Sequence, residues 1–302
     1  MKKILVIGGR RADIDPAEPV SNYADYVAEV TQAAGEEVRV RWCHVDEVVH
    51  VLDGAERRIS TAEDAPLESF DFVWFRGPLT PALNDLAIIT QYLQDKEVAF
   101  GNRRYADRAA MGKLAQMHTL AKLGLPYAKT VSTANTLLAD VIKHELSYPI
   151  ILKATNAGHG KNNFLVKDEA ELVQILEQAE KTQFVAQTFV PNDGDYRLLF
   201  IGDHELIIHR KGVGDSHLNN TSQGGAATLV PVEEFSSETL QQAHEFAQAC
   251  NYQIAGVDVM FHSQTGEACF LEVNSQPQIM TGAFTDEKAQ LMGEYFRQLL
   301  SG

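Results

Sequence analysis

Two carboxylates and one amide occupy strand-like segments near the C-terminal end of the chain: Asp258 in the first segment, Glu272 and Asn274 in the second. Side chains two residues apart on a strand point to the same face, so Glu272 and Asn274 share one face. If residues 264–266 form a three-residue hairpin loop that ends in a left-handed glycine, Asp258 pairs with Glu272 on that face. A two-residue turn would instead pair Asp258 with Leu271 and turn it away.

Carboxylate and amide oxygens are hard ligands, which suit Mg²⁺. The alternative is that Asp258 and Glu272 lie on a half-exposed face and bind nothing. Polar groups inside such apolar strands are costly without a partner, which favours the metal site.

A lysine at the end of another predicted strand stands before a glycine-bearing loop. Lys153 ends the run Pro-Ile-Ile-Leu-Lys, and Gly158 and Gly160 follow it. Glycine lets backbone N–H groups approach phosphate oxygens closely. The spacing is not that of a Walker A motif, which needs glycine where Thr155 stands and serine or threonine where Asn162 stands. From this segment alone, a phosphate loop and an ordinary glycine turn beside a solvated lysine both remain open.

Motifs for hydrolysis and zinc catalysis are missing from the sequence. His144, His204 and His244 each precede a glutamate, but none completes the HExxH motif of zinc proteases. No serine or cysteine stands in a recognised nucleophile motif. The cysteines are far apart and form no CxxC pair, which argues against a disulfide framework and a thiolate zinc site. They are Cys43, Cys250 and Cys269.

The elements of the N-terminal third alternate between strand and helix. Residues 3–8 form an apolar run that ends in glycine, as expected of a strand buried on both faces of a parallel sheet. The pattern then predicts helix 21–34, strand 38–45, strand 70–75, helix 82–95 and strand 98–100. This alternation indicates an open, doubly wound parallel α/β sheet. Gly8 and Gly9 lack the third glycine of GxGxxG, so we do not expect this sheet to bind a dinucleotide.

The second half of the chain has a different pattern, after a helix predicted over residues 107–124. Its predicted strands form antiparallel pairs, which indicates an α+β fold. The pairs are 150–154 with 164–166, 197–201 with 205–209, and 257–261 with 268–273. The turn-rich stretch 211–225 is predicted to be a functional loop.

Composition and charge restrict the class of protein. The 302 residues include 26 Lys+Arg and 41 Asp+Glu, which gives a formal charge of −15. This charge opposes the binding of nucleic acid or anionic lipid. No segment approaches the roughly 18 consecutive apolar residues of a membrane span, and the N-terminal apolar run is too short for a signal peptide. We expect a cytoplasmic enzyme without nucleic-acid or membrane partners, and a homo-oligomer is compatible with the sequence.

From Gly112 to Asn274 the order of motifs resembles the ATP-grasp superfamily, in particular its ribosomal-protein-glutamate-ligase-like and bacterial glutathione-synthetase-like branch. The matching segments are Met111-Gly-Lys113, Pro149-Ile-Ile-Leu-Lys153, Gln187-Thr-Phe-Val190, Asp195-Tyr-Arg197, Arg210 with Asn220 and Gly224-Gly225, and finally Asp258, Glu272 and Asn274. The resemblance implies an N-terminal α/β domain over residues 1–106, followed by an ATP-grasp fold of two α+β subdomains. The central subdomain, with a phosphate lid, spans residues 107–187, and the C-terminal subdomain, with the metal site, spans residues 188–302.

The resemblance also implies roles for individual residues. Those implied to bind ATP are Lys113, Lys153, Gly158, Gly160, Gln187, Phe189, Val190, Asp195 and Arg197. Within this set the lysines bind the α- and β-phosphates, the glycine loop covers the γ-phosphate, the hinge at residues 187–190 receives adenine through backbone groups, and Asp195 binds ribose. Arg210 and Asn220 are implied to be catalytic, with Arg210 on the acyl-phosphate or carbonyl oxygen. The metal candidates match ligands of one or two Mg²⁺ ions, for which Mn²⁺ can substitute.

The implied activity is an ATP- and Mg²⁺-dependent ligase that joins a small-molecule carboxylate to an amine, of the amino-acid or peptide class, through an acyl phosphate. The alternatives are a regulatory protein that binds ATP without turnover, and a carboxylate or small-molecule kinase on the same fold. One position departs from the branch, whose members commonly carry an arginine where this chain has Leu218. Because leucine cannot hold a carboxylate, we expect a substrate that is less anionic than glutamate or that approaches from the other side.

Overall fold

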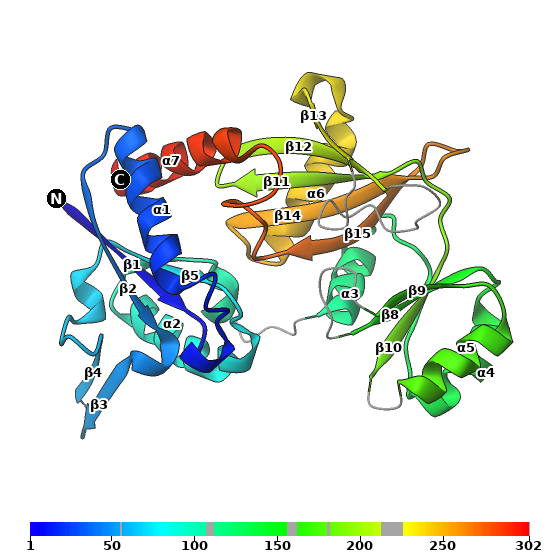
Figure 1. The fold of residues 1–302 in the computed structure, drawn as a ribbon, viewed down its shortest axis with the longest axis horizontal. Coiled ribbons are helices and arrows are strands. Elements are labelled where there is room, and N and C mark those ends of the chain that lie inside the picture. Colours follow the sequence, from blue (N-terminus) through cyan, green and yellow to red (C-terminus); the bar gives the residue numbers. More distant parts are fainter. Residues whose placement is uncertain (55, 107–111, 156–161, 180–181, 213–225, 302) are drawn as a thin grey trace.

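The computed structural model describes residues 1–54, 56–106, 112–155, 162–179, 182–212 and 226–301. Within these ranges the strands form an N-terminal, a central and a C-terminal sheet, together with a short hairpin of β3 (Val49–Asp53) and β4 (Glu56–Ser60) that the sequence analysis did not predict (Figure 1). None of the described helices has the length and apolar character that a membrane crossing requires.

The N-terminal sheet is parallel, with the strand order β2-β1-β5-β6. Its strands are β1 (Lys2–Gly8), β2 (Val38–His44), β5 (Phe72–Arg76) and β6 (Ala99–Gly101). Alternate residues of β1 enter different cores: Ile4 and Val6 pack with α1 (Val20–Ala33), whereas Leu5 and Ile7 pack with α2 (Leu83–Asp95). A continuous apolar strand is therefore covered by helices on both faces, which confirms the doubly wound α/β prediction.

The central sheet is antiparallel and has the order β7-β10-β8-β9. Its strands are β7 (Thr130–Val131), β8 (Ile150–Ala154), β9 (Asn163–Val166) and β10 (Phe184–Thr188). Two helices, α4 (Asn135–Glu145) and α5 (Glu169–Gln178), pack against it in one apolar core that includes Leu138, Leu152 and Leu172. The predicted pairing of residues 150–154 with 164–166 is confirmed, and it places Lys153 at the last pair of β8 with β9, opposite Asn163.

The C-terminal sheet is antiparallel and has the order β13-β12-β11-β14-β15. Its strands are β11 (Asp195–Ile201), β12 (His204–Lys211), β13 (Ala226–Val230), β14 (Ile254–Phe261) and β15 (Ala268–Asn274). One face packs through Leu198, Phe200 and Val257 against α6 (Ser237–Ala249) and α3 (Lys113–Leu123). Because side chains alternate along a strand, Arg197 and Asp258 belong to the opposite face, which we call the polar face.

The β14–β15 hairpin confirms the predicted pairing of Asp258 with Glu272 by a different route. The prediction of a three-residue loop is wrong: the N–H of His262 donates to Glu267 O at 2.9 Å, so the loop comprises residues 263–266. That register alone would pair Asp258 with Leu271. A bulge at Leu271 shifts the ladder by one residue and brings Glu272 opposite Asp258.

The helix predicted over residues 107–124 begins later than expected. Residues 107–111 lie outside the described ranges, and α3 begins at Lys113. Gly112 has φ +101°, a left-handed conformation that interrupts a right-handed helix and that glycine adopts easily. The predicted end is confirmed, because Gly124 takes the left-handed conformation of a C-terminal cap.

The N-terminal and C-terminal sheets share an apolar core, and Asn102 and the last helix add further links between them. The side-chain oxygen of Asn102 accepts the backbone N–H groups of Gln253 and Ile254, each at 2.9 Å, and its amide donates to the carbonyls of Ile254 and Ser275. The last helix, α7 (Thr285–Ser301), packs along α1 (Figure 1). The beginning of β14 and the end of β15 are therefore fixed to the N-terminal sheet.

Candidate active site

Four charged side chains form an ion chain on the polar face of the C-terminal sheet; Asp195, Arg210 and Asp258 are buried and Arg197 is partly exposed. Asp195 pairs with Arg210 across β11 and β12, and Arg197 pairs with Asp258 across β11 and β14. Nε of Arg210 donates to Asp195 at 2.7 Å, and Nη2 of Arg210 lies 3.0 Å from Oδ2 of Asp258. Nε and Nη2 of Arg197 both donate to Asp258 at 2.7 Å. The order of the ion chain is thus Asp195, Arg210, Asp258, Arg197.

The two carboxylates of this ion chain differ in proton affinity. Burial raises the pKa of Asp195, and Arg210 opposes that shift without cancelling it. Burial acts on Asp258 in the same direction, but the guanidinium groups of Arg197 and Arg210 outweigh it and lower the pKa of Asp258. Asp258 therefore stays ionised as the pH falls, and a proton added to the ion chain goes to Asp195 first.

A second set of charged side chains lies between the central and C-terminal sheets. Nζ of Lys113, at the start of α3, lies 3.6 Å from Oε2 of Glu272 on β15. Lys153 of β8 is influenced by the same two charges: burial lowers the pKa of Lys153, the charge of Glu272 opposes this shift, and the charge of Lys113 adds to it. The charge of Glu272 therefore acts on two ammonium groups from different parts of the fold, although only Lys113 lies within ion-pair distance of it. A net positive charge of this kind suits phosphate oxygens.

Helix α3 is held in position on the edge strand β15 by a side-chain amide. Nε2 of Gln116 donates to Val273 O at 2.8 Å, and Oε1 of Gln116 accepts the N–H of Val273 at 3.1 Å. The amide thereby pairs with the free edge of the strand as a neighbouring strand would. Since Gln116 follows Lys113 by about one helical turn, these two bonds place the lysine over Glu272.

The segment between β10 and β11, predicted to be the adenine hinge, runs beside a small apolar cluster. Val190 packs there against Ala128, Met260, Cys269 and Leu271. The strand period could have indicated Met260, because it follows Asp258 by two residues and shares its face. A flat apolar ring such as adenine would find matching surface at this cluster.

The side chains of two of the predicted ATP residues, Gln187 and Asp195, are bound by other side chains of the protein. The side chain of Gln187 is buried and donates to Oγ1 of Thr130 at 2.9 Å, so only its backbone could serve the hinge. Phe189 is half-buried. Asp195 is buried with Arg210 on one of its oxygens, which leaves its second oxygen for a ribose hydroxyl.

Three residues of the predicted site lie outside the described ranges: Gly158, Gly160 and Asn220. Of the metal candidates, Asp258 stands directly opposite Glu272, and Asn274 stands opposite Gly256. Oδ1 of Asn274 accepts the N–H of Gln276 at 2.9 Å. Within the described ranges no cluster of three or more His, Cys, Asp or Glu could hold a metal ion, so a site here needs the amide of Asn274 as well as the two carboxylates.

The carboxylates and lysines of this site fit a magnesium–nucleotide complex. Both oxygens of Asp258 already accept guanidinium N–H groups, whereas Glu272, with 38% of its side chain exposed, has only the longer contact to Lys113 as an ion pair among the described residues. Glu272 is therefore the carboxylate best able to face a cation. The lysines beside it supply charge for phosphates, which normally complete the coordination of Mg²⁺.

Comparison with known proteins identifies relatives that are similar in sequence over part of their length. A probable alpha-L-glutamate ligase of Haemophilus influenzae is 27% identical over 194 residues, which cover 63% of this chain and 63% of that protein. The alpha-aminoadipate–LysW ligase LysX of Sulfurisphaera tokodaii is 26% identical over 173 residues, 55% of this chain and 59% of that protein. The matches therefore span less than two thirds of each relative.

Among solved structures, the macrocyclase MdnC of Microcystis aeruginosa MRC, bound with its precursor peptide MdnA, superimposes with a TM-score of 0.70. The identity is 14%, and the alignment covers 99% of this chain and 100% of that one. At this identity the likeness shows that the fold is shared. A family model described as the RimK-like ATP-grasp domain matches residues 110–293, which is more than half of the chain and includes both lysines, the ion chain and the metal candidates. The chain belongs to the RimK-like ATP-grasp family.

Proposed function

We propose that the protein is an ATP- and Mg²⁺-dependent ligase that joins a carboxylate to an amine through an acyl phosphate. The observation that carries the proposal is the ion contact of Lys113 with Glu272, whose charge also acts on Lys153, on the same face as the ion chain that contains Arg210. Such a reaction requires cations that bind phosphates, a carboxylate that binds a metal and an arginine that binds a reacting oxygen.

The reaction places its main demand on charge neutralisation. A carboxylate is a poor electrophile, so one of its oxygens first attacks the γ-phosphorus of ATP and ADP leaves. The amine nitrogen then attacks the acyl carbon, phosphate leaves, and the nitrogen loses a proton. Phosphoryl transfer relies on alignment and electrostatic stabilisation more than on covalent help from the protein. Lys113 and Lys153 neutralise the α- and β-phosphates in this scheme.

Arg210 is proposed to stabilise the negative oxygen of the acyl phosphate or of the carbonyl under attack, together with Asn220. Its guanidinium is held by Asp195 and Asp258, and although burial acts in the opposite direction, these carboxylates raise the pKa of Arg210. The cation is therefore permanently charged and fixed in direction before substrate arrives. A donor held in this way needs little reorganisation when charge develops.

Asp258, Glu272 and Asn274 are proposed to hold one or two Mg²⁺ ions, which Mn²⁺ can replace. The metal would neutralise charge on the transferring phosphoryl group. The remaining ATP contacts follow the resemblance: Gly158 and Gly160 over the γ-phosphate, the backbone at residues 187–190 at adenine, Asp195 at ribose, and Arg197 as the residue that orients Asp258.

The substrates are proposed to be an amino acid or a peptide on both the carboxylate and the amine side. The names of the relatives support this class, since one is a probable alpha-L-glutamate ligase and another acts on alpha-aminoadipate and LysW. The charge of −15 and the three free, buried cysteines support a cytoplasmic protein without a nucleic-acid or membrane partner. A homo-oligomer is compatible with the sequence.

Incubation with Mg-ATP and pooled amino acids and dipeptides tests the proposed function. We expect phosphate release that rises only when a carboxylate and an amine are both present, accompanied by the mass of their amide. Nucleotide binding without phosphate release would instead identify a regulatory protein. A phosphorylated carboxylate formed without any amine requirement would identify a kinase.

A further inference from the structure

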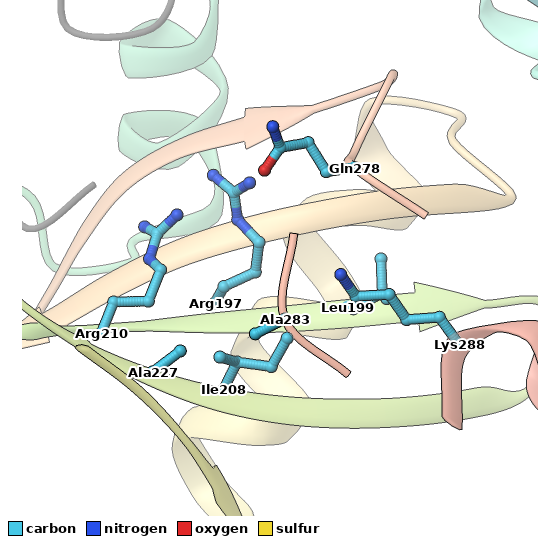
Figure 2. Close-up of a pocket in the computed structure, with 8 residues that line it drawn as sticks. All are labelled: Arg197, Leu199, Ile208, Arg210, Ala227, Gln278, Ala283 and Lys288. Carbon is cyan, nitrogen blue, oxygen red and sulfur yellow. The ribbon is translucent and has the colours of Figure 1, made fainter. Parts of the chain in front are cut away.

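A small cavity lies on the polar face of the C-terminal sheet and has cations at both ends. Its volume is about 30 Å³, room for a carboxylate-sized group. Arg210 and Arg197 line one part of it, and Lys288 reaches it from α7, with Gln278 at its edge (Figure 2). The cavity therefore begins at the proposed catalytic arginine and ends at a lysine from a distant part of the sequence.

Lys288 is a buried cation without a counter-ion. Only 4% of the residue is exposed, and Nζ donates to the carbonyl of Thr281 at 3.1 Å. In the described part of the chain, no carboxylate lies within ion-pair distance of this ammonium group. Lysine is almost never fully buried unless it is paired, so the position needs an explanation.

The two arginines of the cavity differ from Lys288 in this respect, because Asp195 and Asp258 neutralise them. Three cations against two carboxylates leave one positive charge, and that charge is on Lys288. Its ammonium group points from α7 toward Arg197 (Figure 2). Burial lowers the pKa of Lys288 to about 8, and the charge of Arg197 contributes, although Glu287 opposes the shift.

The position of Lys288 in its helix is also unfavourable for a cation. Helix α7 begins at Thr285, so Lys288 stands near its N-terminal end, where the helix dipole favours negative charge. Burial, the neighbouring guanidinium and the dipole all oppose the ammonium group in the empty cavity. An anion bound in the cavity would offset these three unfavourable effects by pairing with the ammonium group.

We propose that this cavity binds a second carboxylate of the substrate, distinct from the one that is activated, and that Lys288 is the residue that recognises it. This inference rests on the proposed function, because it treats the Arg210 end as the reacting end. The substrate class is then a molecule with two carboxylates, such as an acidic amino acid or the acidic side chain of a peptide. Gln278 can donate a further hydrogen bond from the cavity edge.

The proposal revises the expectation drawn from Leu218. That expectation considered only the donors within the loop around position 218, where leucine cannot hold a carboxylate. Lys288 offers a cation from α7 instead, so an anionic substrate no longer needs an arginine at position 218. Because Lys288 lies on a different element from the loop around position 218, a substrate bound by it would approach from another side, as one of the two alternatives drawn from Leu218 expected.

Calorimetric binding to the protein saturated with Mg-ADP tests the proposal without turnover. The probes are L-aspartate, L-glutamate and L-α-aminoadipate, each compared with its side-chain amide and its α-amide. The two kinds of amide distinguish a side-chain from an α-carboxylate. At least one acid should bind about 10–100-fold more tightly than one of its amides, as expected for a charge-assisted hydrogen bond in a buried site.

The variant Lys288→Met should abolish this preference, and Lys288→Arg should retain most of it. Arg297→Met is the matched control, because it removes an exposed cation from the same helix and should leave the preference unchanged. Equal binding of all acids and amides by the unchanged protein would overturn the proposal. So would an undiminished preference in Lys288→Met.

Thermal unfolding distinguishes a purely structural role of Lys288 from a role in carboxylate recognition. If the lysine only anchored Thr281, Lys288→Met would lower the melting temperature and leave the ratio of acid to amide binding unchanged, which would overturn the proposal. We expect the melting temperature to stay the same or rise, because a buried charge without a partner is removed. If the acids bind in a way that depends on Lys288 but no amide forms, the proposed ligase function is refuted and the carboxylate site stands. If an amide forms but the acids bind no more tightly than their amides, the carboxylate site is refuted and the ligase function stands.

Discussion

Glu272→Gln is expected to lower the rate of phosphoryl transfer by about 10²–10³-fold while the fold is retained. The substitution preserves shape and replaces a formal negative charge by a neutral amide at the position that faces the proposed metal. It also removes the carboxylate that Lys113 contacts at 3.6 Å and that supports the charge of Lys153. This single substitution therefore affects both the proposed metal site and the two lysines proposed to bind phosphate.

The measurement is phosphate release under saturating Mg-ATP, with melting temperature as the check on folding. Glu267→Gln is the matched control, since it removes an exposed carboxylate from the same hairpin. A rate in Glu272→Gln that equals the rate of this control would rule out Glu272 as a metal ligand. An excess of Mg²⁺ should restore part of the lost activity if the defect is one of metal affinity.

Lys153→Met is expected to weaken ATP binding by about 10–100-fold, the range for losing a charge-assisted hydrogen bond to phosphate in a buried site. Burial lowers the pKa of Lys153 in the nucleotide-free protein, which means that the charged form is disfavoured there. Replacement by an apolar side chain of similar length should therefore leave the melting temperature unchanged or raise it. The substitution is thus expected to weaken ATP binding without lowering the stability of the protein.

Titration with a non-hydrolysable ATP analogue measures the affinity, and Lys167→Met, an exposed lysine on the same subdomain, is the control. A loss of stability in Lys153→Met with unchanged nucleotide affinity would assign the lysine to the fold and not to ATP. Adenosine, which lacks phosphates, should bind both variants and the unchanged protein equally.

The sequence alone predicts the N-terminal sheet well, because its two central strands, β1 and β5, are short and largely apolar and its strands alternate with helices. Ile4 to Ile7 must be buried on both faces wherever the chain places them, so local pattern decides the outcome. The common face of Glu272 and Asn274 also follows from the strand period. The pairing of Asp258 with Glu272 was predicted from a three-residue loop that the structure does not have, and it arises from the bulge at Leu271. A one-residue shift of this kind depends on contacts along the whole strand, so local pattern does not predict it.

Contacts between distant elements could not be predicted from local pattern. Arg197 is recognisable as part of a motif, but its two bonds to Asp258 require the register of β11 against β14. Lys288 carries even less signal, since it stands in an ordinary amphipathic helix with acidic neighbours. Its burial beside Arg197 depends on where α7 packs, which is against α1 at the opposite end of the chain.

Transfer of oxygen from the carboxylate to phosphate tests the central claim most directly. The carboxylate substrate identified by product mass is labelled with ¹⁸O in the reacting group, and the released phosphate is analysed by mass spectrometry or by ³¹P NMR. Because an acyl phosphate forms through a carboxylate oxygen and breaks at the acyl carbon, the account predicts one ¹⁸O atom in phosphate for each amide formed. Unlabelled phosphate beside labelled amide, or release of AMP and pyrophosphate, would contradict it.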